Sequence, residues 1–136
     1  MLFRSNHGKH WSRYIQNVEN MCCAGVTWSF ITSGTFSVRY LPKGFICDVA
    51  GSAIFPNEKL LIPFTALCNS AFAGAILALV NPTINMQASN VASIPTSQEV
   101  LNNQIVSQFA KDCISLSRTD WDSYETSWDF KRHPLV

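Results

Sequence analysis

Residues 60–80, LLIPFTALCNSAFAGAILALV, run for 21 positions without a charged side chain. A run of this length must be placed in a bilayer or in the core of a folded domain. Pro63, the polar pair Asn69-Ser70 and several alanines weaken the membrane alternative, and Lys59 is the one basic residue beside the run. We therefore expect a long buried helix that starts near Pro63 and ends before Asn81-Pro82. A single membrane span remains the alternative.

The segment before this run predicts strands. Residues 26–32 are rich in β-branched and aromatic side chains, Ser33-Gly34 supplies a turn, and residues 35–41 alternate between apolar and polar side chains. Pro42-Lys43-Gly44 predicts a second turn, which is followed by a short apolar strand at residues 45–49. Together these signals predict a small antiparallel β-meander of three strands.

The segment after the run predicts a structured loop and a second helix. Residues 81–95 are polar, with single apolar anchors at Ile84, Met86, Val91 and Ile94. Thr96-x-x-Glu99 is similar to a capping box, which predicts a helix from about Gln98 to Ser117. Its apolar stripe consists of Leu101, Ile105, Phe109, Cys113 and Leu116. The expected fold class is therefore α+β: a meander, a long buried helix, a structured loop and an amphipathic helix.

Charge is divided unevenly along the chain. The net charge of +1 and the 14% of charged residues do not indicate a nucleic-acid binder by themselves. Residues 1–46 nevertheless include five basic residues and one acidic residue, whereas residues 47–136 include five basic and eight acidic residues. Such a division would let the first half face phosphates while the second packs against protein. The alternative is an ordinary surface with scattered charges.

The cysteines and the N-terminus favour the cytoplasm. The five cysteines are odd in number and include no C-x-x-C pair, so the sequence predicts neither a disulfide framework nor a metal site. Residues 1–14 contain no continuous apolar stretch of the kind that a secretory signal needs. The acidic group Asp120, Asp122, Glu125 and Asp129 lacks the glycine and the ligand rhythm of a calcium loop.

Three blocks of the sequence resemble one protein family. The last residues, Asp120 to Val136, read DWDSYETSWDFKRHPLV; residues 26–48 read VTWSFITSGTFSVRYLPKGFICD and lead into GSAIFP at residues 51–56; residues 81–95 read NPTINMQASNVASIP. These strings are similar, in the same order, to blocks of the PglX family, the adenine-specific DNA methyltransferases of bacteriophage-exclusion (BREX) systems. The resemblance covers the chain from about Ser12 onward.

The resemblance implies a part of a larger enzyme. Members of the family are large multidomain proteins, whereas 136 residues make one domain at most, so we expect a C-terminal fragment. Methyl transfer needs a glycine-rich loop for S-adenosylmethionine and an (N/D/S)-P-P-(Y/F) loop for the flipped adenine. Asn81-Pro82-Thr83-Ile84 shares only the first two letters of that loop. We therefore expect no catalytic residue and no cofactor in this chain, and S-adenosylmethionine in the parent family.

What remains is recognition of double-stranded DNA. The resemblance divides the chain into a poorly matched segment at 1–25, a partial target-recognition domain at 26–117 and a tail at 118–136. Arginine and lysine contact phosphates, and asparagine and glutamine read base edges. The candidate phosphate contacts are Lys9, Arg13, Arg39 and Lys43, and the candidate readers are Gln16, Asn17, Asn85 and Gln87. Each of these side chains also has a purely structural alternative, such as finishing a strand or satisfying backbone groups in a loop.

The tail predicts a docking element. Trp121 and Trp128 lie seven residues apart, so on a helix they would share one face and could anchor into grooves of a larger protein. The acidic residues between them would be repelled by phosphates. We expect the tail to dock onto the upstream methyltransferase domain or another BREX protein. The alternative function for the whole chain is therefore a small protein-interaction module.

Overall fold

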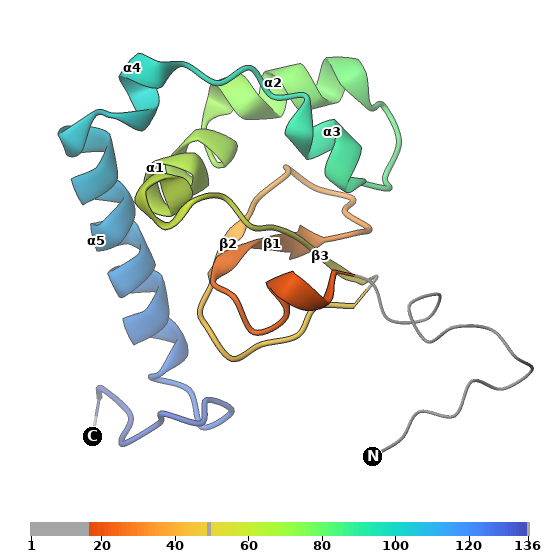
Figure 1. Cartoon of the computed structure of the whole chain (residues 1–136). Coiled ribbons are helices and arrows are strands. Elements are labelled where there is room, and N and C mark those ends of the chain that lie inside the picture. Colours follow the sequence, from red (N-terminus) through yellow and green to blue (C-terminus); the bar gives the residue numbers. More distant parts are fainter. Residues whose placement is uncertain (1–16, 49, 136) are drawn as a thin grey trace, which may run out of the picture.

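The computed structural model describes residues 17–48 and 50–135 (Figure 1). Within these residues, a short 3-10 helix, η3 (Val18–Asn20), precedes a three-stranded sheet and five α-helices. The strands are β1 (Gly25–Ser29), β2 (Arg39–Leu41) and β3 (Gly51–Ile54). The helices are α1 (Glu58–Cys68), α2 (Ala71–Val80), α3 (Ala88–Ala92), α4 (Gln98–Leu101) and α5 (Gln104–Trp121). The predicted α+β class is confirmed.

The sheet is antiparallel, but its central strand is β1 and its order is β2-β1-β3. A meander would have placed the second strand in the centre. The predicted third strand at residues 45–49 is also wrong, since Phe45 and Ile46 are exposed and the pairing falls on β3. The third strand starts later than predicted because of a local turn. In this turn the Asp48 carboxylate accepts hydrogen bonds from the N–H groups of Ala50 and Gly51, at 2.9 and 3.0 Å. This turn directs the chain back along β1, where Trp28 lies opposite Ser52.

The uncharged run forms two helices instead of one. α1 begins at Glu58, where the Asn57 side chain caps the N–H of Lys59 at 3.1 Å, so Pro63 lies inside the helix. α1 and α2 are bent by 75° at the Asn69-Ser70 pair. Ser70 caps α2 by accepting from the N–H of Ala73 at 3.2 Å. α2 ends at Val80, as predicted from Asn81-Pro82.

Asn69 joins this bend to the sheet layer. Its side-chain oxygen accepts from the Val38 N–H at 2.9 Å, and its side-chain amide donates to the Val38 carbonyl at 3.1 Å. The Asn69 side-chain amide thus makes the two backbone hydrogen bonds that a neighbouring strand would otherwise make with Val38. These bonds hold the loop between β1 and β2 against the end of α1.

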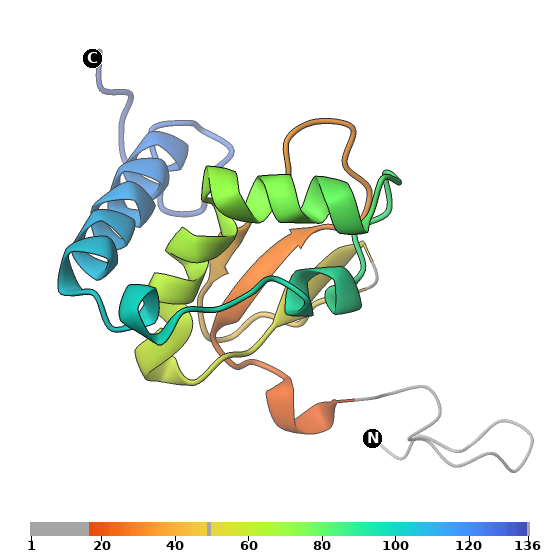
Figure 2. The same ribbon diagram turned by 90° about the horizontal axis from the view of Figure 1, so that it is seen from above.

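The core lies between the sheet and the helices. α1, α2 and α3 cover one side of the sheet, and η3 and the loop between β2 and β3 lie on the other (Figures 1 and 2). The core includes the side chains of Val26, Trp28, Leu61, Cys68, Leu77, Met86 and Val91. In the predicted loop, Met86, Val91 and Ile94 are buried as expected, whereas Ile84 is exposed and residues 88–92 form α3.

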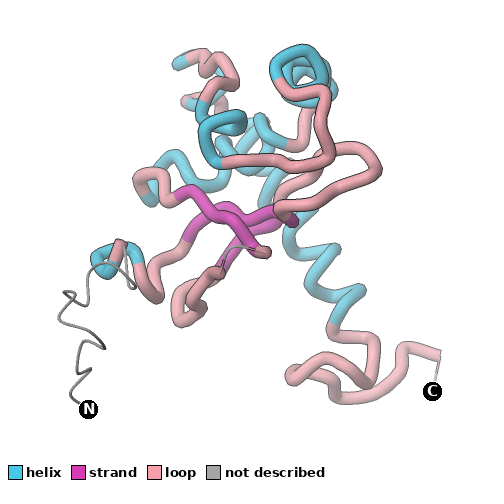
Figure 3. Tube along the Cα trace, turned by 90° about the vertical axis from the view of Figure 1, so that its right-hand side faces the viewer, coloured by secondary structure: helices cyan, strands magenta, loops and turns pink. Residues whose placement is uncertain are grey.

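The predicted second helix is also divided. α4 ends at Leu101, and α5 begins after Asn103, whose side chain accepts from the N–H groups of Ile105 and Val106. The Thr96 capping box is wrong, because Ser97 is the residue before α4. α5 packs along α1 with Ala110 buried. It runs past the sheet to the loops at the C-terminal end (Figure 3). The rest of the predicted stripe, Ile105, Phe109, Cys113 and Leu116, is exposed.

Within the described residues, no single helix has both the length and the apolar composition to cross a membrane. α1 and α2 have the length and the apolar composition of a membrane span only when they are counted as one segment, and the two helices are bent by 75° relative to each other.

Candidate nucleic-acid interface

Arg39 lies on the face of the sheet that points away from α1. It is the first residue of β2 and pairs with Thr27. Side chains alternate along a strand, and paired residues share a face, so Val26 and Tyr40 point to the core while Thr27 and Arg39 point away from it. Arg39 is exposed. Its guanidinium is therefore accessible to a phosphate. Lys9, Arg13 and Gln16 lie outside the described residues.

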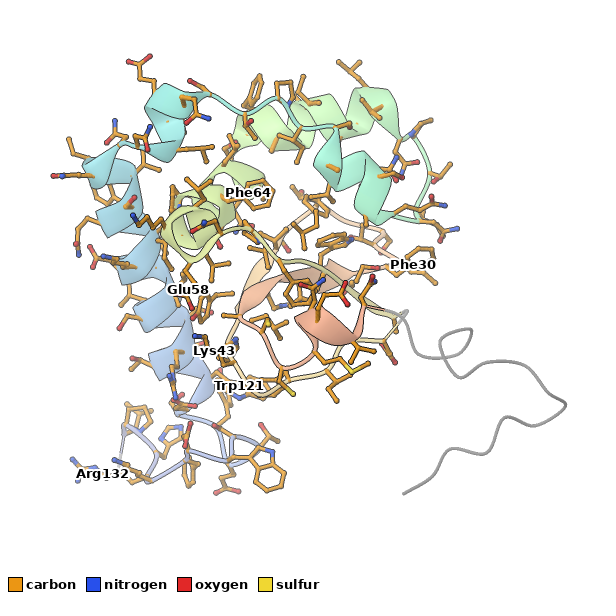
Figure 4. The ribbon with its side chains drawn as sticks, in the orientation of Figure 1. Phe30, Lys43, Glu58, Phe64, Trp121 and Arg132 are labelled. Carbon is orange, nitrogen blue, oxygen red and sulfur yellow. The ribbon has the colours of Figure 1, made fainter. Side chains whose placement is uncertain are left out.

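Lys43 has an acidic partner. It lies in the predicted turn after β2, where Gly44 adopts a φ of 101° and donates its N–H to the Cys22 carbonyl at 3.0 Å. The Lys43 ammonium contacts the Glu58 carboxylate at 2.7 Å, between the sheet and α5 (Figure 4). The hydrogen bond and the charge of Glu58 raise the pKa of Lys43, and the same contact lowers the pKa of Glu58. A phosphate would have to compete with Glu58 for this ammonium group.

The loop after α2 is ordered by Asn81. Its side-chain oxygen accepts from the N–H and hydroxyl of Thr83, at 3.1 and 2.6 Å, and its amide donates to the Asn85 carbonyl at 2.6 Å. Asn81 is thus a structural residue, which is the alternative that the sequence offered for it. The buried Trp28 Nε1–H donates to the Met86 carbonyl at 2.9 Å and fastens this loop to β1.

The loop also extends the pairing of β1. Ile31 forms an antiparallel bridge with Asn85, with the Thr32 N–H donating to Ile84 and the Met86 N–H to Phe30. Two of the sequence blocks, residues 26–48 and 81–95, therefore meet at the end of the central strand.

Asn85 and Gln87 are exposed at that end. The Gln87 N–H donates to the Asn90 side chain at 2.9 Å, so the backbone of Gln87 starts α3 while its side-chain amide stays accessible. Asn85 pairs four residues further along the strand than Arg39 does, which corresponds to roughly 13 Å at 3.3 Å per residue. Lys43 follows β2 at the opposite end of the central strand. Among the described candidates, Arg39 and Asn85 are therefore closer to one another than Lys43 is to Asn85. Asn17 lies apart, before η3.

The tail folds back on the end of α5. Arg118 contacts the carboxylates of Asp129 at 3.2 Å and Asp122 at 3.6 Å, and the Ser127 hydroxyl donates to Asp122 at 2.7 Å. α5 ends at Trp121, and Trp128 lies in the turns that follow, fully exposed. The expectation that the two tryptophans share a helical face is therefore wrong. Their docking role stays a prediction.

Few groups in the described residues suggest chemistry of their own. No three His, Cys, Asp or Glu side chains gather into a metal-binding group within residues 17–48 and 50–135. Burial raises the pKa of the Cys68 thiol to about 12, so this cysteine is protonated at neutral pH. A thiol in that state is a poor nucleophile.

Comparison with known proteins identifies the family. The chain is 36% identical over 115 residues to the adenine-specific methyltransferase BrxX of Escherichia coli O9:H4 (strain HS). It is also 36% identical over 112 residues to the adenine-specific methyltransferase PglX of Lacticaseibacillus casei (strain Zhang). Each match covers 82% of this chain. The chain belongs to the PglX family. No family model matches it.

The chain spans only 9% of the length of either PglX-family relative. The matched part is therefore a small portion of a much longer protein in both cases. The family resemblance read from the three sequence blocks is confirmed, whereas the roles of the individual residues in those blocks stay predictions.

The surface of this PglX-family segment also has a property that the sequence reading missed. The uncharged run does not stop at residue 80 but continues to Gln98, so residues 60–98 contain no Asp, Glu, Lys, Arg or His. These residues form most of α1, all of α2 and α3, and the Asn81 loop. Arg39 lies across the sheet from this layer. The exposed amides of Asn85 and Gln87 belong to this uncharged segment, which offers no cation to a phosphate.

Proposed function

We propose that this chain forms part of the DNA target-recognition portion of a PglX-type adenine-specific methyltransferase of a BREX phage-exclusion system. The observation that carries the proposal is the match of 82% of the chain to two adenine-specific methyltransferases. A methyltransferase that acts at a particular DNA sequence needs a surface that reads bases of the cytoplasmic DNA, in addition to the pocket that holds the flipped adenine. Methyl transfer from S-adenosylmethionine takes place, in this proposal, on the remaining part of the protein.

The residues fit two classes of DNA contact. Arg39, exposed on the face of the sheet that points away from α1, suits a phosphate. Asn85 and Gln87 carry the side-chain amides that pair bidentately with adenine in the major groove. The hydrogen bonds of Asn81 and Trp28 hold their loop in one conformation, which lowers the entropic cost of presenting these amides to a base. Lys9 and Arg13 would supply further phosphate contacts.

The phosphate contact is tested by titrating the whole chain with a labelled duplex at several salt concentrations and following fluorescence anisotropy. Arg39→Ala is expected to weaken binding to every duplex and to reduce the slope of log K against log salt by about 0.9. Lys111→Ala is the matched control, because Lys111 is an exposed cation on α5, in the acidic half of the chain. Equal losses in both variants, or no binding at low salt, would refute the proposal for this chain.

The base contacts need a different readout. The preferred duplex is first selected from a random pool with the unaltered chain. Asn85→Ala or Gln87→Ala is then expected to cost about 1–3 kcal/mol on that duplex while leaving binding to unrelated duplexes unchanged. Gln104→Ala, which removes an exposed amide from α5, serves as the control. A uniform loss on all duplexes would show that these residues do not read bases.

A second candidate function is a protein-interaction module that docks on a BREX component through the tail. It is favoured by Trp128, whose whole side chain is exposed in a tail that Arg118 holds in place. Trp128→Ala should abolish capture of the purified BREX component, whereas Leu135→Ala, which truncates another exposed apolar side chain, should not. Retention of binding by Trp128→Ala would exclude the tail as the anchor.

A further inference from the structure

The outer surface of α2 is apolar, uncharged and exposed. Only Ala73 and Leu77 of its ten residues are buried. Phe72 and Leu79 lie seven residues apart on one face and are 51% and 82% exposed. Val80 and Ile84, at the end of the helix, are 51% and 58% exposed. We call these four residues the α2 surface. The helix that carries most of them, α2, lies in front of the sheet in the view from above (Figure 2).

This surface is unlike a solvated helix face. A surface helix carries charged or polar side chains on the side opposite the core, whereas residues 60–98 include no Asp, Glu, Lys, Arg or His. Large apolar side chains that gather on a surface mark a site of contact with another apolar body. A phosphate backbone does not fit on the α2 surface, because phosphates need cations and none of its four residues is charged.

The apolar stripe of α5 has a different character. Its exposed residues Ile105, Phe109 and Leu116 share a helix with Asp112 and Asp120, which are also exposed. The same helix carries the exposed cations Lys111 and Arg118. A partner for α5 must therefore match charges of both signs, whereas a partner for the α2 surface must offer none. The two surfaces consequently select different partners by charge.

We propose that the α2 surface docks on an uncharged, apolar surface of the remaining part of a PglX-type methyltransferase. The occupant follows from the length of the relatives: the chain matches only 9% of each, so a large protein body accompanies the homologous segment in both. An interface core that excludes charge is typical of permanent contacts within one protein. The inference rests on the proposed function only in that the segment works as part of the methyltransferase, and it makes no use of DNA binding.

The first experiment measures binding of the whole chain to a PglX-type methyltransferase from which the homologous segment has been removed, by calorimetry in the absence of DNA. Leu79→Asp and Phe72→Asp are expected to weaken binding more than tenfold, because each places a charge in the apolar contact. Ile105→Asp, a matched change on α5, is expected to leave the affinity unchanged. Far-UV circular dichroism checks that each variant is folded.

The second experiment avoids the truncated partner. A photoreactive phenylalanine analogue is placed in a full-length PglX-type relative at the position aligned with Leu79. It is expected to cross-link to residues of the same molecule that lie outside the homologous segment, as identified by mass spectrometry.

Four results would overturn the inference. The first is a loss of binding in Ile105→Asp but not in Leu79→Asp, and the second is a dimer of the chain that Leu79→Asp dissociates. The third is flotation of the chain with phosphatidylethanolamine–phosphatidylglycerol vesicles. The fourth is a full-length relative that cross-links only between molecules. Loss of DNA binding in Arg39→Ala leaves all of these readouts unchanged, so failure of the proposed function and failure of this inference are distinguishable.

Discussion

Replacement of Trp28 by phenylalanine tests whether the Asn81 loop is fastened to the sheet through one indole N–H. Trp28 is 1% exposed, and its Nε1–H donates to the Met86 carbonyl at 2.9 Å. Phenylalanine keeps an aromatic ring in the core but removes this donor. The Met86 carbonyl, on a residue that is itself buried, then loses the partner that satisfies it.

The expected loss of stability has two parts. An unsatisfied buried acceptor costs about 1–3 kcal/mol. The smaller ring also leaves unfilled space in the core, which adds roughly 1 kcal/mol by comparison with other large-to-small substitutions. Trp28→Phe should therefore lower the free energy of unfolding by about 2–4 kcal/mol.

Urea unfolding followed by far-UV circular dichroism measures this loss without depending on tryptophan fluorescence. Trp128→Phe is the matched control, since the same change at a fully exposed site should alter stability by less than about 0.5 kcal/mol. Hydrogen exchange at the N–H groups of Thr32 and Met86, which pair across this junction, should become faster in Trp28→Phe alone. Equal stability of the two variants would refute the role assigned to the indole.

Three further predictions concern charge and protonation. Glu58→Gln should return the pKa of Lys43 toward its ordinary value, as followed by NMR, and raise duplex affinity about two- to fivefold by freeing the ammonium group. Arg118→Ala should change the free energy of unfolding by less than about 1 kcal/mol, because its ion pairs are exposed, while hydrogen exchange in residues 123–130 becomes faster. The folded state holds the Cys68 proton up to about pH 12, whereas the unfolded chain loses it near pH ~8.5. The stabilisation that comes from burying the Cys68 thiol is thus complete below pH ~8.5 and is lost as the pH rises through about 12. Urea unfolding of Cys68→Ala should lack this part of the pH dependence, and Cys113→Ala should keep it.

The fold class could be predicted from composition and periodicity, but the division of the uncharged run could not. Hydropathy favours one helix across residues 60–80, because an isolated Asn69-Ser70 pair is tolerated within helices. The deciding contacts are tertiary: the Asn69 amide bonds to Val38, more than thirty residues away, and Ser70 caps the second helix. The break therefore depends on a partner that no local pattern shows.

The third strand was predicted at the wrong residues for a related reason. Residues 45–49 have the apolar content of a strand, whereas Gly51 and Ser52 have poor strand propensity. The pairing of Trp28 with Ser52 places a small side chain beside the largest one in the core. Packing against Trp28 thus outweighs propensity. In α5 the predicted apolar stripe is not the buried face, because Ile105, Phe109, Cys113 and Leu116 are exposed, whereas Ala110 is buried where the helix packs on α1.

The candidate DNA contacts were chosen by residue type, and type alone does not give their surroundings. Arg39 is accessible, as a phosphate contact must be, but Lys43 is engaged by Glu58 from a different part of the chain. The bridge between Ile31 and Asn85 could not be predicted either, because it joins two sequence blocks across more than fifty residues. Family resemblance supplied the blocks, and only the structure shows that they meet.

The phosphate contact proposed at Arg39 and the α2 surface lie on opposite sides of the sheet, and this separation can be tested. The pairing of β2 places Arg39 on the face away from α1. α2, which carries most of the α2 surface, lies on the other side of the sheet (Figure 1). Residues that share no partner contribute independently. In Arg39→Ala combined with Leu79→Asp, the loss of duplex affinity should equal that of Arg39→Ala, and the loss of docking should equal that of Leu79→Asp. A coupling of more than about 0.5 kcal/mol in either measurement would mean that one surface serves both partners, because independent sites add to within that margin.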